Sequence, residues 1–346
     1  MANLQEYFRK FHNSIKLDYD DNKELRDKRD ELIEFLKDNM PEESCSFKTF
    51  NQGSYAMFTG VKALDGGDYD IDIALLFNLS KEDYSNPITV KKWVYDSFCK
   101  EYDDVEMKKP CVTVKFESEG ENERDYHVDL AVFSSENQDG QTYLARGQLH
   151  SAPENRCWEH SDPEKLVSDI KGFPSDSQDR EQFRRIVRFM KRWKDIKFKG
   201  QVNRPSGIGL TVAGLTHFQA QYTQDFFTNT RKYSDLDALE IFVQSMLNSF
   251  IPVLNSEGEW EDRLRVCLPT PPNNDIYSKM TGNQMMGFKD KLQCLLNKVQ
   301  EAKLETDPVI ACELMVEEFG DDFPIPTVSN TAQKRGPSII IDNSSA

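Results

Sequence analysis

The chain has 346 residues, of which 38% are hydrophobic and 29% charged, so it can bury a core and has the length of two domains or one large composite domain. Its formal net charge of −16 repels duplex DNA and RNA, and we therefore expect no duplex nucleic acid as a partner. Small anions held by a metal ion remain compatible with this charge.

The cysteines and the hydropathy pattern indicate the cellular compartment. Seven cysteines are scattered without a CxxC pair, which argues against a zinc ribbon and against a disulfide framework. No segment approaches the roughly 20 consecutive apolar residues that cross a bilayer. We therefore expect a soluble, cytoplasmic protein with no membrane partner.

The first part of the chain is expected to be helical. Apolar residues recur at helical spacing from Leu4 to Ile15 and, after a polar break at residues 20–22, again until Pro41. This pattern predicts either two helices or one long bent helix, which together would form an N-terminal helical spine.

Short runs rich in β-branched residues follow and predict a sheet. The expected strands cover residues 46–50, 69–77, 111–116 and 126–133. Between them, Pro87 opens a segment with helical spacing that we expect to pack on the sheet.

Beyond residue 150 the apolar spacing becomes helical again. The expected helices cover residues 164–173, 179–198, 209–222, 236–250 and 284–304. The predicted fold class is α+β, with a mixed sheet packed on a C-terminal helical lobe and the active cleft between them. The expected domains are residues 1–150 for the spine and sheet, 151–327 for the helical lobe and 328–346 for a flexible tail.

Three aspartates on two of the expected strands form a candidate metal site. Asp70 and Asp72 are two residues apart, so a strand places them on one face, and Asp129 lies on a later strand between apolar neighbours. Three such carboxylates can hold two Mg²⁺ ions about 4 Å apart, an arrangement suited to phosphoryl chemistry. The alternative is that these aspartates lie on a solvated strand edge, as is common for a single DxD.

A Gly-Ser pair precedes these strands. Gly53 lets the backbone approach a ligand closely, and Ser54 offers an N–H and a hydroxyl to phosphate oxygens. Taken alone, the pair is more typical of a plain turn. The order Gly-Ser, then DxD, then a lone aspartate on a later strand is what favours a phosphate site.

The segment 179–198 carries a cationic row next to its apolar stripe. Arg184, Arg188 and Lys191 fall at i, i+4 and i+7, where a row facing the cleft would pair with phosphates. For Arg184 we favour a solvated face instead. Ser206 precedes a helical run, so it is a candidate N-cap whose helix end also attracts phosphate. His127 shares the strand face of Asp129, and a structural role is preferred for it over a metal or proton-transfer role.

These motifs together resemble a known superfamily. GSYAM, YDIDIALLF and YHVDLAVF are similar to the GS…DhD…D signature of polymerase-beta-like nucleotidyltransferases. FRRIVRFMKRWKDIK, PSGIGLTVAGL and FGDDFPIP resemble the CD-NTases, bacterial relatives of cyclic GMP-AMP synthase in anti-phage defence, and in particular their dinucleotide-cyclase branch. The resemblance covers residues 45 to 326.

The resemblance implies a function and a set of site residues. The enzyme would condense ribonucleoside triphosphates, ATP or GTP, into a cyclic di- or trinucleotide second messenger with release of pyrophosphate. The metal ligands would be Asp70, Asp72 and Asp129, with two Mg²⁺ ions or with Mn²⁺ in their place. The triphosphate would be bound by Gly53, Ser54, Arg188, Lys191 and Ser206.

The resemblance also implies partners, and the alternatives stay open. A downstream effector would recognise the product, and a ubiquitin-transfer-like enzyme would join the tail ending at Ala346 to other molecules. The alternatives are linear addition of nucleotides to RNA or to a protein, and an inactive nucleotide-binding scaffold, because fold alone does not establish activity.

Overall fold

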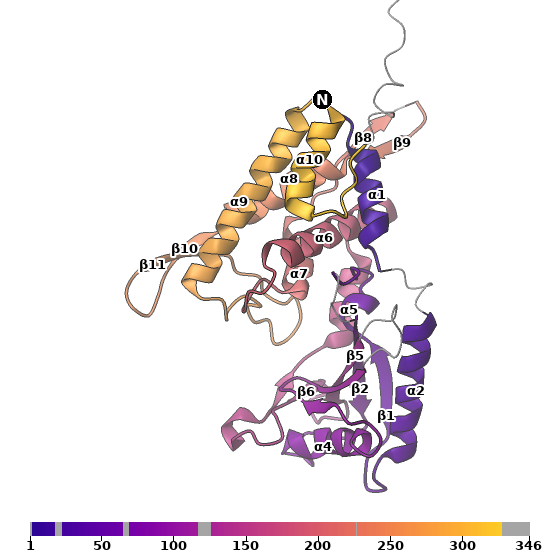
Figure 1. Cartoon of the computed structure of the whole chain (residues 1–346). Helices are drawn as coiled ribbons and strands as arrows, with labels where there is room; N and C mark the ends of the chain where they lie inside the picture. Colours follow the sequence, from indigo (N-terminus) through magenta and orange to yellow (C-terminus); the bar gives the residue numbers. More distant parts are fainter. Residues whose placement is uncertain (1, 18–22, 65–68, 117–125, 226, 327–346) are drawn as a thin grey trace, which may run out of the picture.

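The computed structural model describes residues 2–17, 23–64, 69–116, 126–225 and 227–326. It has two lobes (Figure 1), one built on a mixed sheet and one built of helices. The expected tail, residues 328–346, lies outside the described residues. None of the helices in the described part is both long and apolar enough to cross a membrane.

The sheet follows the expected strands closely. Its main path runs in the order β1 (Phe47–Asn51), β2 (Tyr69–Phe77), β5 (Tyr126–Ser134), β4 (Val112–Phe116) and β3 (Val105–Met107). The pair β2 and β5 is parallel, and the other pairs are antiparallel. Two further strands, β6 (Tyr143–Arg146) and β7 (Cys157–His160), extend from β5.

One face of this sheet is covered by α2 (Lys23–Asn39) and α4 (Pro87–Phe98). The odd-numbered apolar residues of β2, such as Ile71 and Ile73, pack in the core beneath these helices, as do Val128 and Leu130 of β5. Because successive side chains of a strand point to opposite faces, the even-numbered residues of β2 and the odd-numbered residues of β5 face the other way, toward the helical lobe.

The helical lobe contains the five expected helices in its described part. They are α5 (Pro163–Gly172), α6 (Ser177–Lys197), α7 (Gly207–His217), α8 (Asp235–Asn248) and α9 (Gly282–Leu304). The sequence patterns did not indicate α10 (Pro308–Phe319), nor the two hairpins formed by β8 (Tyr222–Asp225) with β9 (Thr230–Tyr233) and by β10 (Ile251–Leu254) with β11 (Trp260–Arg263).

The first two helices belong to different lobes, which corrects the expectation of one spine grouped with the sheet. α1 (Gln5–Ile15) packs on α6 and α8 (Figure 1), and its Phe8 and Phe11 rings lie 5.3 and 5.2 Å from the ring of Phe189. α2 packs on α4 in the sheet lobe instead. The core of the helical lobe therefore takes in the apolar residues of α1, and it also takes in Met57 from the segment that follows β1.

Candidate active site between the two lobes

The three expected aspartates converge on the sheet face toward the helical lobe. In the parallel register of β2 and β5, Asp72 lies beside Asp129 and Asp70 beside His127. Ligand atoms of Asp70, His127 and Asp129 all lie within 4.8 Å of one another. The predicted convergence is confirmed, and it includes a histidine for which a structural role had been preferred.

The short helix α3 (Gly53–Ala56) carries the Gly-Ser pair to the same place. Gly53 has a φ of +69°, and a Cβ atom there would lie 1.8 Å from Oδ2 of Asp72. Only glycine meets both conditions, because it tolerates positive φ and leaves room for the carboxylate. The glycine thus lets the backbone of α3 lie directly against Asp72.

The carboxylates are crowded. Burial raises the pKa of Asp72 to about 7, and repulsion by Asp70 and Asp129 contributes to the rise. His127, whose Nε2 lies 3.3 Å from Oδ1 of Asp70, has a raised pKa chiefly because of its hydrogen bond to that carboxylate. A cluster of this kind favours a bound cation, which relieves the repulsion.

Asp129 is held in place by residues of the neighbouring chain segment. Thr113, opposite Asp129 in the antiparallel register of β4 and β5, donates its hydroxyl proton to Oδ1 at 2.5 Å. Nζ of Lys108 lies 3.7 Å from the same oxygen. These contacts fix one carboxylate oxygen of Asp129.

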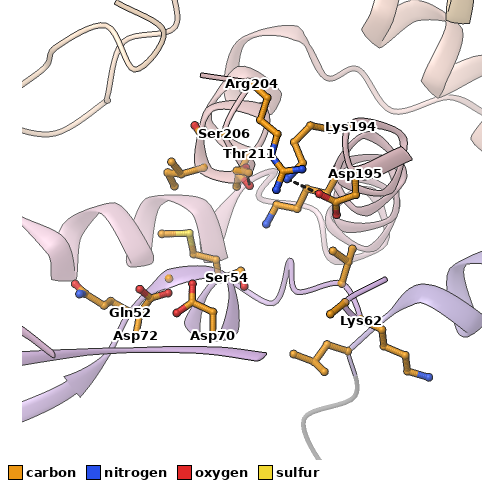
Figure 2. A pocket seen from close by; sticks show the side chains of 18 of the residues that line it. Gln52, Ser54, Lys62, Asp70, Asp72, Lys194, Asp195, Arg204, Ser206 and Thr211 are labelled. Atoms are coloured by element: carbon orange, nitrogen blue, oxygen red, sulfur yellow. Dashed lines mark hydrogen bonds and ion pairs between the residues drawn. The ribbon is translucent and has the colours of Figure 1, made fainter. Parts of the chain in front are cut away.

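A cavity of about 810 Å³ lies between the lobes and includes most of the expected site. In Figure 2, Asp70 and Asp72 lie next to Ser54 on one side, and Ser206, Thr211 and Arg204 lie on the other. Its volume falls within the range of ligand sites for small molecules.

The helical wall of this cavity is cationic. Its positive charges come from Lys191, Lys194, Lys199 and Arg204, and Lys62 adds a further positive charge from the segment that follows α3. Lys194 forms an ion pair at 2.6 Å with Asp195, the one acidic residue that the helical lobe contributes to the described lining. A wall of cations opposite a wall of carboxylates is suited to a triphosphate that is also bound to metal.

Lys191 is buried at this wall. Its Nζ donates to the backbone carbonyl of Thr59 at 3.0 Å and to Oγ1 of Thr59 at 3.1 Å. Burial lowers the pKa of Lys191 to about 7, and the neighbouring Lys194 and Arg188 lower it further. An anion in the cavity would favour the charged form.

Ser206 is the N-cap of α7, as expected, and its hydroxyl accepts a hydrogen bond from the N–H of Gly209 at 3.1 Å. Because Ser206, Gly207 and Ile208 all line the cavity, the positive end of the α7 dipole is directed at it. The capping and anion-binding interpretations of this residue are therefore compatible.

Arg188 lies elsewhere than expected. It is not among the residues that line the cavity, and its guanidinium donates to the carbonyls of Gly60 at 3.0 Å and Phe58 at 2.7 Å. Arg192, one turn later, donates to the carbonyl of Lys62 at 2.9 Å. Lys191, Arg188 and Arg192 thus bind the segment 58–62 to α6 through its carbonyls. Because this segment follows α3, Arg188 contacts backbone next to the Gly-Ser pair.

A second, smaller cavity of about 220 Å³ adjoins the first. The two share Gln52, Asp72, Pro163 and Leu166 in their linings, and Asp129 lines the smaller one only. Asp72 thus stands between two spaces, with Asp70 on one side and Asp129 on the other.

Sequence reasoning missed several of these residues. Lys199 and Arg204 lie in the connection between α6 and α7, outside any periodic segment, so their cluster of charge just before Ser206 was the available signal. Thr113 lies in a run of β-branched residues that is typical of any strand, and only the register shows its contact with Asp129.

Comparison with known proteins agrees with this geometry. Residues 47–133 match the family model of the nucleotidyltransferase domain of cyclic GMP-AMP synthase DncV-like proteins. A cyclic GMP-AMP synthase from Escherichia albertii is 26% identical over 270 residues. The match covers 72% of this chain, and the chain spans 57% of the length of that relative.

Solved structures share the fold along nearly the whole chain. DncV from Vibrio cholerae, described as a cyclic AMP-GMP synthase, is similar with a TM-score of 0.66 and 15% identity over 94% of this chain and 98% of that one. CdnC from E. coli MS115-1, solved with ATP, has a TM-score of 0.65 and 16% identity over 93% and 99%. The fold class expected from the motifs is confirmed. The family match over residues 47–133 agrees with the resemblance that those motifs carry.

Proposed function

We propose that this chain is an enzyme that joins ribonucleoside triphosphates with release of pyrophosphate. The proposal starts from the match of residues 47–133 to the DncV-like nucleotidyltransferase domain. The observation that carries the proposal is the position of Asp72. It lies in register with Asp129, against Gly53, and in the linings of two adjoining cavities, one of which has a cationic far wall.

The donor set fits divalent metal ions. Asp70, Asp72 and Asp129 offer the hard oxygen ligands that Mg²⁺ and Mn²⁺ prefer. Burial, and then the neighbouring Asp70 and Asp129, raise the pKa of Asp72, and a bound cation would favour its charged form. When bound, two such ions activate an attacking hydroxyl and neutralise charge on the triphosphate and the leaving pyrophosphate.

The larger cavity is assigned to the donor triphosphate. Gly53 and Ser54 approach it from α3, the N-terminus of α7 at Ser206 approaches it from the opposite wall, and Lys191 with its neighbouring cations supplies positive charge. Arg188 is assigned a positioning role, because its hydrogen bonds hold the segment that follows α3.

The smaller cavity is assigned to the acceptor, because Asp129 lines it. A ribose hydroxyl held there attacks the α-phosphate of the donor. An oxygen–phosphorus bond forms, the bond from the α-phosphorus to the oxygen bridging to the β-phosphate breaks, pyrophosphate leaves, and the hydroxyl proton passes to solvent. Positioning and charge neutralisation supply most of the rate.

Closure to a cyclic dinucleotide or trinucleotide is the form of this reaction that we favour. It is supported by the names of the similar proteins, a cyclic GMP-AMP synthase and a cyclic AMP-GMP synthase. The nucleotides in the titles of the similar structures support ATP and GTP as substrates. A cytoplasmic role in anti-phage signalling, with an effector that recognises the product, is proposed from the resemblance of the sequence motifs alone. Conjugation through the tail at residues 328–346 belongs to the same proposal; deleting the last residues should abolish high-mass conjugates in cells.

Release of pyrophosphate tests the transfer step. Purified protein with the four ribonucleoside triphosphates and Mg²⁺ or Mn²⁺ should release pyrophosphate, and Asp72→Asn or Asp129→Asn should lower the rate at least about a hundredfold. Asp104→Asn, a change at an exposed carboxylate that pairs with Lys115, is the matched control and should keep the wild-type rate. Equal rates in all four proteins would contradict the proposal.

A further inference from the structure

The carboxylates of the candidate metal site lie beside a nitrogen donor that the three aspartates do not supply. His127 lies on β5 directly opposite Asp70 of β2, and its Nε2 is 3.3 Å from Oδ1 of Asp70. Ligand atoms of Asp70, His127 and Asp129 lie within 4.8 Å of one another, whereas Asp72 is not a member of that compact group.

The three donors lie near enough to one another to surround one six-coordinate ion after small movements. Ligand atoms about 2.1 Å from such an ion lie roughly 3 Å apart when adjacent and roughly 4.2 Å apart when opposite. The 4.8 Å limit therefore allows the three donors to share an ion after small rotations of the side chains. His127 is half-buried, so its ring is available to the site without being fixed in the core. On binding an ion, Nε2 would release its proton to solvent and exchange its hydrogen bond to Asp70 for the bond to the metal.

The chemistry of the donors differs from that of an all-carboxylate site. Mg²⁺ prefers oxygen ligands and gives up its bound water reluctantly, whereas first-row transition metals accept an imidazole nitrogen readily. A site with two carboxylates and one imidazole therefore discriminates between these ions, and a site with oxygen donors alone does so less.

We infer that His127 is a direct ligand at one of the metal positions, where it makes the site prefer Mn²⁺ over Mg²⁺. The inference rests on the proposed function in that it concerns the same metal site. It goes beyond that function in naming a fourth ligand and the ion that this ligand selects.

Binding of the metal alone tests the inference without reliance on turnover. The full chain, freed of metal, is titrated with Mn²⁺ while unbound Mn²⁺ is followed by electron paramagnetic resonance, and Mg²⁺ is then added as competitor. The ratio of the two dissociation constants should favour Mn²⁺ in the wild type and shift toward Mg²⁺ at least about tenfold in His127→Gln. His150→Gln, at an exposed histidine of the same lobe, should leave the ratio unchanged.

Pulsed electron paramagnetic resonance on the wild type adds a readout that no folding defect can imitate. Bound Mn²⁺ should show a hyperfine coupling to a directly bonded ¹⁴N, and that coupling should be missing in His127→Gln. An unchanged metal ratio, or Mn²⁺ bound without the ¹⁴N coupling, would overturn the assignment of His127 and leave the proposed transferase intact, provided that Asp70→Asn still weakens binding. Wild-type protein that binds neither ion would contradict both proposals.

Discussion

At the scale of single residues, the site depends on contacts that hold Asp129. The Thr113 hydroxyl occupies one carboxylate oxygen, which leaves the other for a metal ion or a substrate hydroxyl. Thr113→Val keeps the shape of the side chain but removes the donor, so the carboxylate gains freedom to rotate. We expect about a 10- to 100-fold loss of pyrophosphate release, the usual effect of losing a partner that orients a metal ligand.

The control for this variant is Thr113→Ser, which keeps the hydroxyl and should recover most of the rate. Thermal or denaturant unfolding should show a change below about 2 kcal/mol for Thr113→Val, because one hydrogen bond is lost. Equal activity of the valine and serine variants would show that the hydroxyl does not position Asp129.

A second residue-scale prediction concerns pH and stability. His12 accepts a hydrogen bond from Nη1 of Arg188 at 3.0 Å, because a guanidinium can only donate. Burial, together with Arg188, lowers the pKa of His12 to about 3. Since the unfolded chain binds this proton near pH 6.5, stability is complete above that pH and declines as the pH falls toward 3.

At pH 5 this single group should cost about 2 kcal/mol of unfolding free energy relative to pH 7.5. His12→Gln retains an acceptor for Arg188 but does not titrate, so its unfolding free energy should fall by about 2 kcal/mol less than that of the wild type over this interval. Urea unfolding at both pH values measures the difference. Parallel pH profiles for the two proteins would contradict the assignment.

At the scale of elements, α6 acts on the site through the backbone of segment 58–62. Arg188, Lys191 and Arg192 donate to carbonyls of this segment, which joins α3 to the rest of the sheet lobe. Buried carbonyls that lose a charged donor are left without a partner, a costly state. α6 therefore couples the helical lobe to the Gly-Ser backbone.

Arg188→Gln should destabilise the protein by about 2 to 4 kcal/mol and raise the KM for nucleoside triphosphate more than it lowers kcat. The reason is that α3, which would approach the triphosphate in the proposed function, loses its support. Arg184→Gln is the comparison on the same helix, and it separates the loss of a side-chain contact from the loss of hydrogen bonds to the backbone. Its guanidinium pairs with the exposed Glu181 and lies 4.9 Å from the centre of the Phe58 ring, so its loss should cost about 1 kcal/mol and change KM less than Arg188→Gln does.

The elements were largely predictable from the sequence, and their partners were not. Alternation of apolar residues gave β2 and β5 nearly to the residue, and the two-residue spacing placed Asp70 and Asp72 on one face. The register between the strands, which puts His127 beside Asp70, depends on packing that no single strand encodes. The cationic row on α6 was likewise visible, but its spacing could not show that Arg188 donates to the carbonyls of Phe58 and Gly60.

At the scale of the whole molecule, the grouping of elements depends on contacts between distant segments. The apolar stripe of α1 predicted a helix, but such a stripe does not indicate which surface of the protein will bury it. In the structure, α1 packs in the core of the helical lobe. The cavity is similarly composite, since its acidic wall comes from β2 and its cationic wall from α6 and the segment before α7. Such a site forms only when both lobes are folded.

The chemical identity of the product tests the central claim most directly. Wild-type protein is incubated with the four ribonucleoside triphosphates and Mg²⁺ or Mn²⁺, treated with phosphatase and analysed by mass spectrometry beside the double variant Asp70→Asn, Asp72→Asn. The account predicts a phosphatase-resistant cyclic oligonucleotide from the wild type that is missing from the variant. Linear products alone would contradict ring closure, and the same products from both proteins, or none from either, would contradict the assignment of the carboxylate site.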